Sequence, residues 1–250
     1  MIYLVFIFGS LIGSFLNVCI YRIPKGESIA YPPSSCTDCN NKLKLLDLIP
    51  IVSYILLKGR CRYCKSKISI KYPLIEFMNG IIYLMLFIRF GLSILTIKYF
   101  IISSILVVVT FIDYKYQIIP DGLIIFGLIS IFIMHILDNF HIGFINSILG
   151  MLIGGGSFLT IALITKGAMG GGDVKLMALL GFALGPWNIL LNIFLSFIIG
   201  AIICLILLVF GIKTRKDYIA FGPFIAIACF ITICYGNEII SWYINYIGII

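Results

Sequence analysis

The chain has 250 residues, of which 62% are apolar and only 11% are charged, and its mean hydropathy is +1.16. Soluble globular proteins contain far fewer apolar residues, so this balance excludes a soluble enzyme and indicates a polytopic membrane protein. The formal net charge of +8 does not indicate a nucleic-acid partner, because the basic residues gather in one loop and at the ends of apolar segments. We therefore expect an all-α protein that lies in a lipid bilayer.

The first apolar segment, residues 1–21, has no basic residues before it and has Arg22 and Lys25 directly after it. This pattern predicts an uncleaved first transmembrane helix with its N-terminus outside. Residues 22–72 form the one sizeable polar region and hold ten Lys and Arg against three acids. Because short loops rich in Lys and Arg stay on the side of synthesis, we expect this loop to be cytoplasmic.

Two Cys-x2-Cys pairs stand in this loop with 21 residues between them, Cys36 with Cys39 and Cys61 with Cys64. Two such pairs about twenty residues apart can direct four thiolates at one tetrahedral metal ion. Two disulfides are the alternative, which a reducing cytosol disfavours. The spacing predicts a structural zinc site, because four protein ligands leave no open position for catalysis. Zinc would also help such a polar loop to fold.

From residue 73 onward the chain is nearly all apolar and divides into seven further candidate spans. These are residues 73–90, 96–113, 119–137, 143–165, 174–185, 187–211 and 219–248. With the N-terminus outside, about eight transmembrane helices place sixteen of the eighteen Lys and Arg inside and leave only Arg89 and Lys98 outside. We expect three parts, which are a first helix at 1–21, a zinc-binding domain at 22–72 and a seven-helix membrane domain at 73–250.

Two acidic residues stand at the ends of predicted spans, where a carboxylate is costly unless it has a partner or a task. Asp173 follows three glycines within residues 169–175, and Asp113 ends the third span. Alone, Asp173 could simply cap a flexible turn. Under the predicted topology, however, both acids emerge on the same face and could meet. Two carboxyl groups held close together share a proton and can activate water while polarising a carbonyl group, as in aspartic proteases.

Asp121 competes with Asp113 for the role of the first acid. It follows Pro120, and an acid in the first turn of a helix complements the helix dipole, so we take Asp121 as structural and Asp113 as catalytic. The two histidines, His135 and His141, flank the external end of the fourth span, where we expect a surface role.

Several motifs, in order along nearly the whole chain, resemble the type IV prepilin leader peptidases, also called prepilin peptidase/N-methyltransferases. This family consists of membrane aspartic proteases of the Gly-x-Gly-Asp kind. The four cysteines resemble its cytoplasmic zinc knuckle, and Asp113 and Asp173 resemble its two catalytic acids. The other similar segments are residues 13–18, 21–24, 72–76, 119–121, 170–175 and 221–224.

The resemblance implies a multi-pass enzyme of the bacterial plasma membrane with its active site facing the cytoplasm. The implied reaction is cleavage of the short basic leader of type IV prepilins or pseudopilins, after a glycine that precedes their apolar helix. In many members, methylation of the new N-terminus with S-adenosylmethionine follows. The residues that bind this methyl donor are not assigned by the resemblance, and the zinc loop and Glu76 are the candidates.

Four alternatives stay open on the sequence. A peptidase without methyltransferase activity carries the same motifs, and a Gly-x-Gly-Asp protease of presenilin type would not need the four cysteines. A polytopic carrier would use Asp113 and Asp173 as ion or proton sites, but it predicts acids at the bilayer midplane and often inverted repeats. A zinc-loop adaptor protein would leave both acids unexplained.

Overall fold

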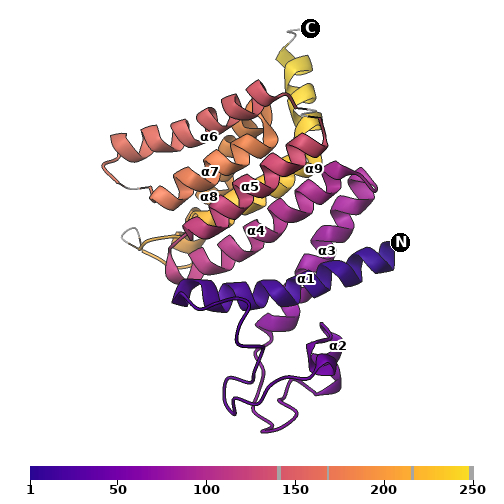
Figure 1. Ribbon diagram of the computed structural model, residues 1–250. Coiled ribbons are helices and arrows are strands. Elements are labelled where there is room, and N and C mark those ends of the chain that lie inside the picture. Colours follow the sequence, from indigo (N-terminus) through magenta and orange to yellow (C-terminus); the bar gives the residue numbers. More distant parts are fainter. Residues whose placement is uncertain (140–141, 168, 215–216, 248–250) are drawn as a thin grey trace. The chain divides into compact units, whose positions relative to one another are not determined.

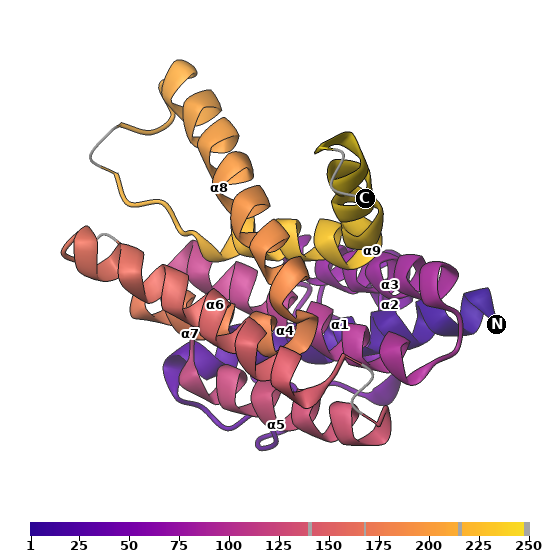
Figure 2. The same cartoon turned by 90° about the horizontal axis from the view of Figure 1, so that it is seen from above.

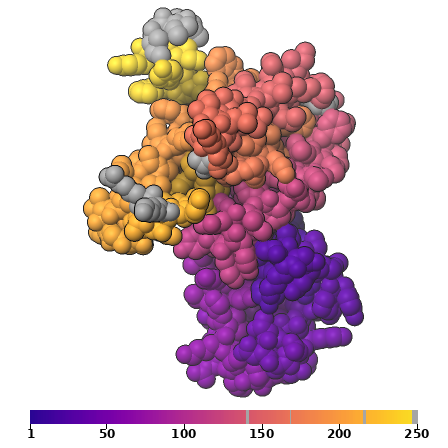
Figure 3. All heavy atoms as spheres, turned by 90° about the vertical axis from the view of Figure 1, so that its left-hand side faces the viewer, coloured from indigo at the N-terminus to yellow at the C-terminus, as the bar shows by residue number. Residues whose placement is uncertain are grey.

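A computed structural model describes residues 1–139, 142–167, 169–214 and 217–247, which are drawn in colour in Figure 3. These residues are 73% helical and contain no strand. The predicted all-α fold class is confirmed. Helices are the expected solution, because a chain in lipid must satisfy its backbone polar groups within each segment.

Within the described residues, eight helices correspond to the eight predicted spans, and the polar loop adds three short ones. The helices are α1 (Ile2–Arg22), η1 (Ile23–Lys25), η2 (Leu45–Leu48), α2 (Val52–Leu56), α3 (Lys71–Phe90), α4 (Ile94–Tyr116), α5 (Asp121–Leu137), α6 (Phe144–Ile164), α7 (Gly171–Leu184), α8 (Pro186–Val209) and α9 (Gly222–Ile247). Of the described helices, α1, α3, α4, α6, α8 and α9 are long and apolar enough to cross a membrane, whereas α5 and α7 are shorter. The chain is therefore a multi-pass membrane protein.

The chain forms two compact units, Met1–Thr96 and Ile97–Ile250. In the first unit, α1 and α3 lie side by side (Figure 1), and the polar loop joins them. The two helices approach closely because small residues line their contact. A Cβ built on Gly13 would lie 2.8 Å from the Cα of Glu76, so only glycine fits at this crossing.

In the second unit, α6 and α7 lie side by side in both Figure 1 and Figure 2. Gly150 and Gly154 on α6 face α7, and Gly181 on α7 faces α6. A Cβ built on Gly181 would overlap the carbonyl oxygen of Gly150, so the two backbones touch directly. Helices approach this closely only where small residues line the contact, and the glycines therefore position α7.

Replacing Gly181 by alanine is expected to destabilise the protein by about 2 kcal/mol, because the added methyl group meets rigid backbone atoms. The matched control is Gly156→Ala on α6, where a Cβ has no atom within 4 Å. This control should keep or slightly raise the melting temperature, since alanine favours a helix over glycine. Thermal unfolding of both variants in detergent checks the prediction, and equal melting temperatures would contradict the close α6–α7 contact.

α7 is too short to cross a bilayer by itself. It has 14 residues and ends at Leu184, after which Gly185 takes a φ of 79° and Pro186 begins α8. At 1.5 Å per residue its length is about 21 Å, against about 30 Å for the hydrocarbon core of a membrane. The two ends of α7 cannot both reach water, so they need polar partners within the protein.

Candidate active site and metal-binding loop

Asp113 lies near the end of α4 and is buried, with 6% of its surface exposed. Its Oδ2 accepts the backbone N–H of Gly222, the first residue of α9, at 2.8 Å. The N-terminus of a helix carries a partial positive charge, so this contact favours the ionised carboxylate and fixes its direction. A Cβ on Gly222 would lie only 2.7 Å from the same oxygen, which explains the need for glycine there.

Asp173 is the third residue of α7 and is also buried, with 9% of its surface exposed. Its carboxylate accepts the backbone N–H of Gly170, the N-cap residue of α7. The Oδ1 atom, in contrast, is buried and has no hydrogen-bond partner among the described residues. Leaving a buried carboxylate oxygen without a donor costs free energy, so the position indicates a task beyond capping.

The carboxyl groups of Asp113 and Asp173 interact electrostatically, although they belong to different helices. Each is held at a helix N-terminus, Asp113 by α9 and Asp173 by α7. Two carboxyl groups in one buried site share a proton, because both cannot ionise easily. The structure thus brings together the two acids that the sequence singled out, while their catalytic role remains a prediction.

Asp121, the competing acid, has a different environment. It is the first residue of α5, and its side chain is 62% exposed. Its Oδ1 pairs with Nζ of Lys175 at 2.7 Å. An exposed ion pair of this kind contributes little to stability, about 0–1 kcal/mol. This environment suits the structural role that the sequence predicts for Asp121.

The three glycines before Asp173 differ in the space around them. A Cβ on Gly170 would lie 3.2 Å from Oδ2 of Asp173, and one on Gly172 would lie 2.8 Å from the Cβ of Ile119. A Cβ on Gly171 would have no atom within 4 Å. The Gly-x-Gly-Asp pattern therefore has a steric basis, because the first and third positions are crowded and the middle one is open.

At the other end of α7, two buried polar side chains meet the last carbonyl groups. Nζ of Lys98 donates to the carbonyl oxygen of Ala183 at 3.2 Å, and Nε2 of His135 lies 3.0 Å from that of Phe182. Lys98 and His135 are 3% and 1% exposed. The expected surface role of His135 is therefore wrong, and His141 lies outside the described residues. The carbonyl groups at a helix C-terminus attract cations and N–H donors, so these residues cap α7.

The four cysteines of the polar loop converge on one point. Their sulfur atoms all lie within 4.8 Å of one another, and those of Cys36 and Cys64 are 3.8 Å apart. All four are free thiols. Tetrahedral ligands with metal–sulfur bonds of about 2.3 Å stand about 3.8 Å apart, so this set of thiols can hold one metal ion.

The two Cys-x2-Cys turns have the same backbone geometry. Cys36 and Cys61 each donate their N–H to the carbonyl oxygen five residues later, at 3.0 and 2.9 Å. The residue after the second cysteine, Asn40 in one turn and Lys65 in the other, has a φ of 55° or 62°. The local sequence thus builds the same sulfur-presenting turn twice, and the loop places the two turns face to face.

The thiols differ in how easily they ionise. The backbone N–H groups of Cys39 and then Asp38 lower the pKa of Cys36 to about 6, and the hydroxyl of Ser66 lowers the pKa of Cys64. The N–H of Asn41 also acts to lower the pKa of Cys39, but desolvation and the neighbouring sulfur atoms raise it to about 11. Close thiolates repel one another, so a bound cation is needed for all four to be ionised together.

Glu76, a candidate for the methyl-donor site, is buried on α3 with 8% of its surface exposed. Its Oε2 accepts the N–H of Ile51 at 2.8 Å, and its carboxylate also bonds to the side chain of Ser14. These contacts join the polar loop, α1 and α3. Glu76 therefore acts as a structural tie within the first unit.

Comparison with known proteins identifies two matching regions, one in the first part of the chain and one in the second. Residues 7–90 match the bacterial peptidase A24 N-terminal domain, and residues 100–205 match the type IV leader peptidase family. A prepilin leader peptidase/N-methyltransferase from Bacillus subtilis is 34% identical over 98% of both chains. Proteins of the same name from Pseudomonas putida and Aeromonas hydrophila are 30% and 32% identical, each over 97% of this chain and 93% of their own.

No solved structure matches the chain. The relatives nevertheless align with it from end to end, through the cysteine loop as well as the helices that carry Asp113 and Asp173. Similarity of this extent leaves one assignment: the chain belongs to the prepilin leader peptidase/N-methyltransferase family.

Proposed function

We propose that this chain cleaves the leader peptide of type IV prepilins or prepilin-like proteins, with Asp113 and Asp173 as an aspartic dyad. It then methylates the new N-terminal amine. The observation that carries the proposal is the buried, interacting pair of carboxyl groups, each held at a helix N-terminus. Membership of the family supports this reaction over the carrier and adaptor alternatives.

The contacts of the two acids suggest how they divide the chemistry. Asp113, which accepts the N–H of Gly222, is the ionised partner, and Asp173, whose Oδ1 lacks a donor, carries the shared proton. Asp113 takes a proton from water as the water oxygen attacks the scissile carbonyl carbon, while Asp173 donates its proton to the carbonyl oxygen. The C–N bond then breaks, the leaving amine takes the proton from Asp113, and Asp173 recovers its own as the carbonyl re-forms.

The proposal places the N-terminus outside and both the polar loop and the dyad on the cytoplasmic side of the bacterial plasma membrane. Lys115 and Lys175 each follow a dyad acid by two residues, and such basic residues favour the cytoplasmic face. The prepilin or pseudopilin substrate is itself a membrane helix, so its scissile bond would meet the dyad near the bilayer surface. We also propose the three parts that the sequence predicts, which are a first transmembrane helix at 1–21, a zinc-binding domain at 22–72 and a membrane peptidase domain at 73–250.

Zinc is the metal that we propose for the cysteines, because four thiolates in tetrahedral geometry form a structural zinc site. S-adenosylmethionine is the proposed methyl donor and supplies the methyl group. The polar loop 22–72 and Glu76 are the candidate locations for methyl transfer. The carboxylate of Glu76 already accepts hydrogen bonds from Ile51 and Ser14, which makes the polar loop the stronger candidate.

The function is tested with purified protein in lipid nanodiscs and a prepilin-type substrate, with and without S-adenosylmethionine. Mass spectrometry should find the leader released in both reactions and one methyl group on the new N-terminus only when the methyl donor is present. Cleavage without methylation would favour the peptidase-only alternative. An intact substrate under both conditions would refute the proposal.

The glycine pattern before Asp173 gives a matched pair of variants. Gly172→Ala is expected to lower cleavage by about tenfold or more, because its Cβ would push against Ile119 and displace the first turn of α7. Gly171→Ala should cleave at nearly the wild-type rate, because its Cβ enters open space. Initial cleavage rates of the two variants check this, and a Gly171→Ala variant as impaired as Gly172→Ala would argue against the steric explanation.

A further inference from the structure

The polar loop contains an apolar segment, residues 45–57, in which six of the large aliphatic side chains are exposed. Their exposed fractions run from 41% to 87%, and they are Leu45, Leu46, Ile49, Val52, Ile55 and Leu56. Soluble surfaces carry such residues singly, whereas a group of them marks a site of contact with lipid or with another protein.

The polar groups of the same segment point inward. Its only charged residue is Asp47, whose side chain is 3% exposed and pairs with Nε of Arg62 at 2.7 Å. The hydroxyl of Tyr54 donates to the carbonyl oxygen of Ile68 at 3.4 Å. A loop surrounded by water would bury the leucines and expose the aspartate, so the reversed arrangement indicates an apolar surrounding.

The segment is attached to a membrane helix at a defined depth. Ile51, in its middle, donates its N–H to Glu76 at 2.8 Å and takes a φ of 62°. A β-branched residue rarely adopts this φ, so the tertiary contact holds the turn. Glu76 is the sixth residue of α3, which places it about 7.5 Å along the helix from its start. Ile51 therefore lies beside the first turns of a candidate span, which places the segment near the boundary between membrane and water.

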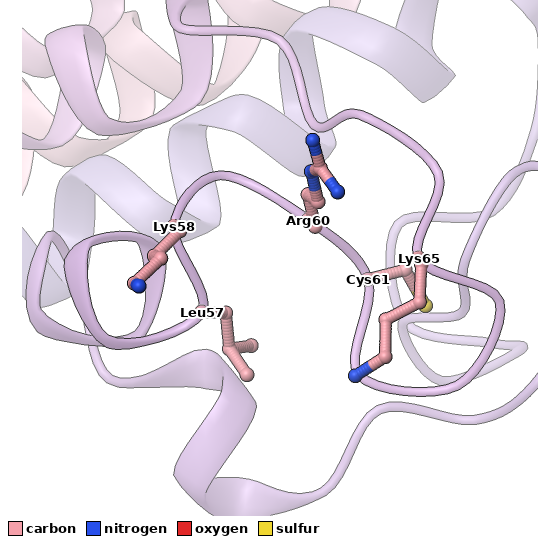
Figure 4. Close-up of a pocket in the computed structure, with 5 residues that line it drawn as sticks. All are labelled: Leu57, Lys58, Arg60, Cys61 and Lys65. Atoms are coloured by element: carbon pink, nitrogen blue, oxygen red, sulfur yellow. The ribbon is translucent and has the colours of Figure 1, made fainter.

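Basic residues border the apolar side chains. Lys58, Arg60 and Lys65, together with Leu57 and Cys61, line a hollow of about 400 Å³ just after α2 (Figure 4). None of these lining residues is acidic. Cations beside exposed aliphatic side chains complement an anionic phospholipid, whose phosphate and acyl chains lie next to each other.

We propose that residues 45–57 insert their exposed aliphatic side chains into the headgroup–acyl boundary of the membrane, with anionic phospholipid at the hollow lined by Lys58, Arg60 and Lys65. The inward ion pair of Asp47 with Arg62 removes the one acid that would oppose this contact. The four-cysteine turns are thereby docked on the bilayer and do not move freely in water. This docking surface does not depend on the proposed dyad.

The test uses full-length protein with Trp187→Phe and Trp242→Phe, which removes both native tryptophans. Leu56→Trp then reports on the segment, and Tyr31→Trp, in the same loop and equally exposed at 76%, is the matched control. Both variants are placed in nanodiscs of phosphatidylcholine and phosphatidylglycerol with acyl chains brominated near the headgroup. The Leu56→Trp variant should lose about half of its fluorescence to brominated lipid and should resist quenching by aqueous iodide. The Tyr31→Trp variant should be quenched by iodide and should keep its fluorescence in brominated lipid.

Two results would overturn the docking. Equal iodide quenching of both variants would place the segment in water. Protection of the Leu56→Trp variant from both quenchers would mean that protein, such as a second copy or a bound substrate, covers it.

The proposed binding of anionic phospholipid at the hollow is tested in nanodiscs of phosphatidylcholine alone, where quenching of Leu56→Trp by brominated lipid should weaken. Unchanged quenching there would refute the role of the hollow.

Discussion

Asp113→Asn and Asp173→Asn are each expected to reduce leader cleavage by about 10²–10⁴-fold, which is the usual contribution of a general acid or base. The physical reason is that an amide can neither take the proton from water nor pass one to the scissile carbonyl group. The matched control is Asp121→Asn, which removes only an exposed ion pair with Lys175 and should remain largely active. Initial cleavage rates of a prepilin-type substrate by the three purified variants provide the measurement.

Thermal unfolding of the same variants separates lost chemistry from lost folding. Asp173 holds a buried carboxylate oxygen without a donor, so Asp173→Asn should leave the melting temperature unchanged or higher. A variant that is inactive but equally stable supports the dyad. If both Asp113→Asn and Asp173→Asn cleave at the wild-type rate, the dyad is wrong.

Cys61→Ser is expected to remove bound zinc and to unfold the loop of residues 22–72. Cys61 is the most buried of the four proposed ligands, with 3% of its surface exposed. Structural zinc contributes about 10–16 kcal/mol of binding free energy in small zinc-binding peptides, so we expect a loop of this size to lose its fold without the metal. Zinc content by elemental analysis and the rate of limited proteolysis within the loop are the measurements.

Cys204→Ser is the control for this variant, because Cys204 is a free thiol on α8, outside the cysteine cluster. It should keep one zinc ion per chain and the wild-type proteolysis pattern. Zinc content that is equal in the Cys61→Ser and Cys204→Ser variants would contradict the metal site. Treating the wild-type protein with a chelator should have the same effect as Cys61→Ser, namely loss of zinc and faster proteolysis of the loop, since it removes the same cation.

The sequence by itself indicated the helical fold and the four cysteines of the candidate metal site. Apolar runs in a membrane chain must become helices, because lipid offers no hydrogen-bond partners to the backbone. The spacing of the cysteines defines two local turns, and such turns need no distant contact to form. The two acids were also recognisable from the sequence, since a carboxylate at the end of a span is rare without a reason.

Only the tertiary structure decided which distant residues position the two acids and the ends of α7. The N–H that fixes Asp113 comes from Gly222, 109 residues away, and the buried caps of α7 come from Lys98 on α4 and His135 on α5. No local pattern specifies such contacts, because they follow from the packing of helices that are distant in sequence. For the same reason, the local sequence does not specify that the leucines around α2 are exposed while the side chain of Asp47 is buried. Hydrophobicity fixes which segments enter the membrane, and packing fixes which side chains meet there.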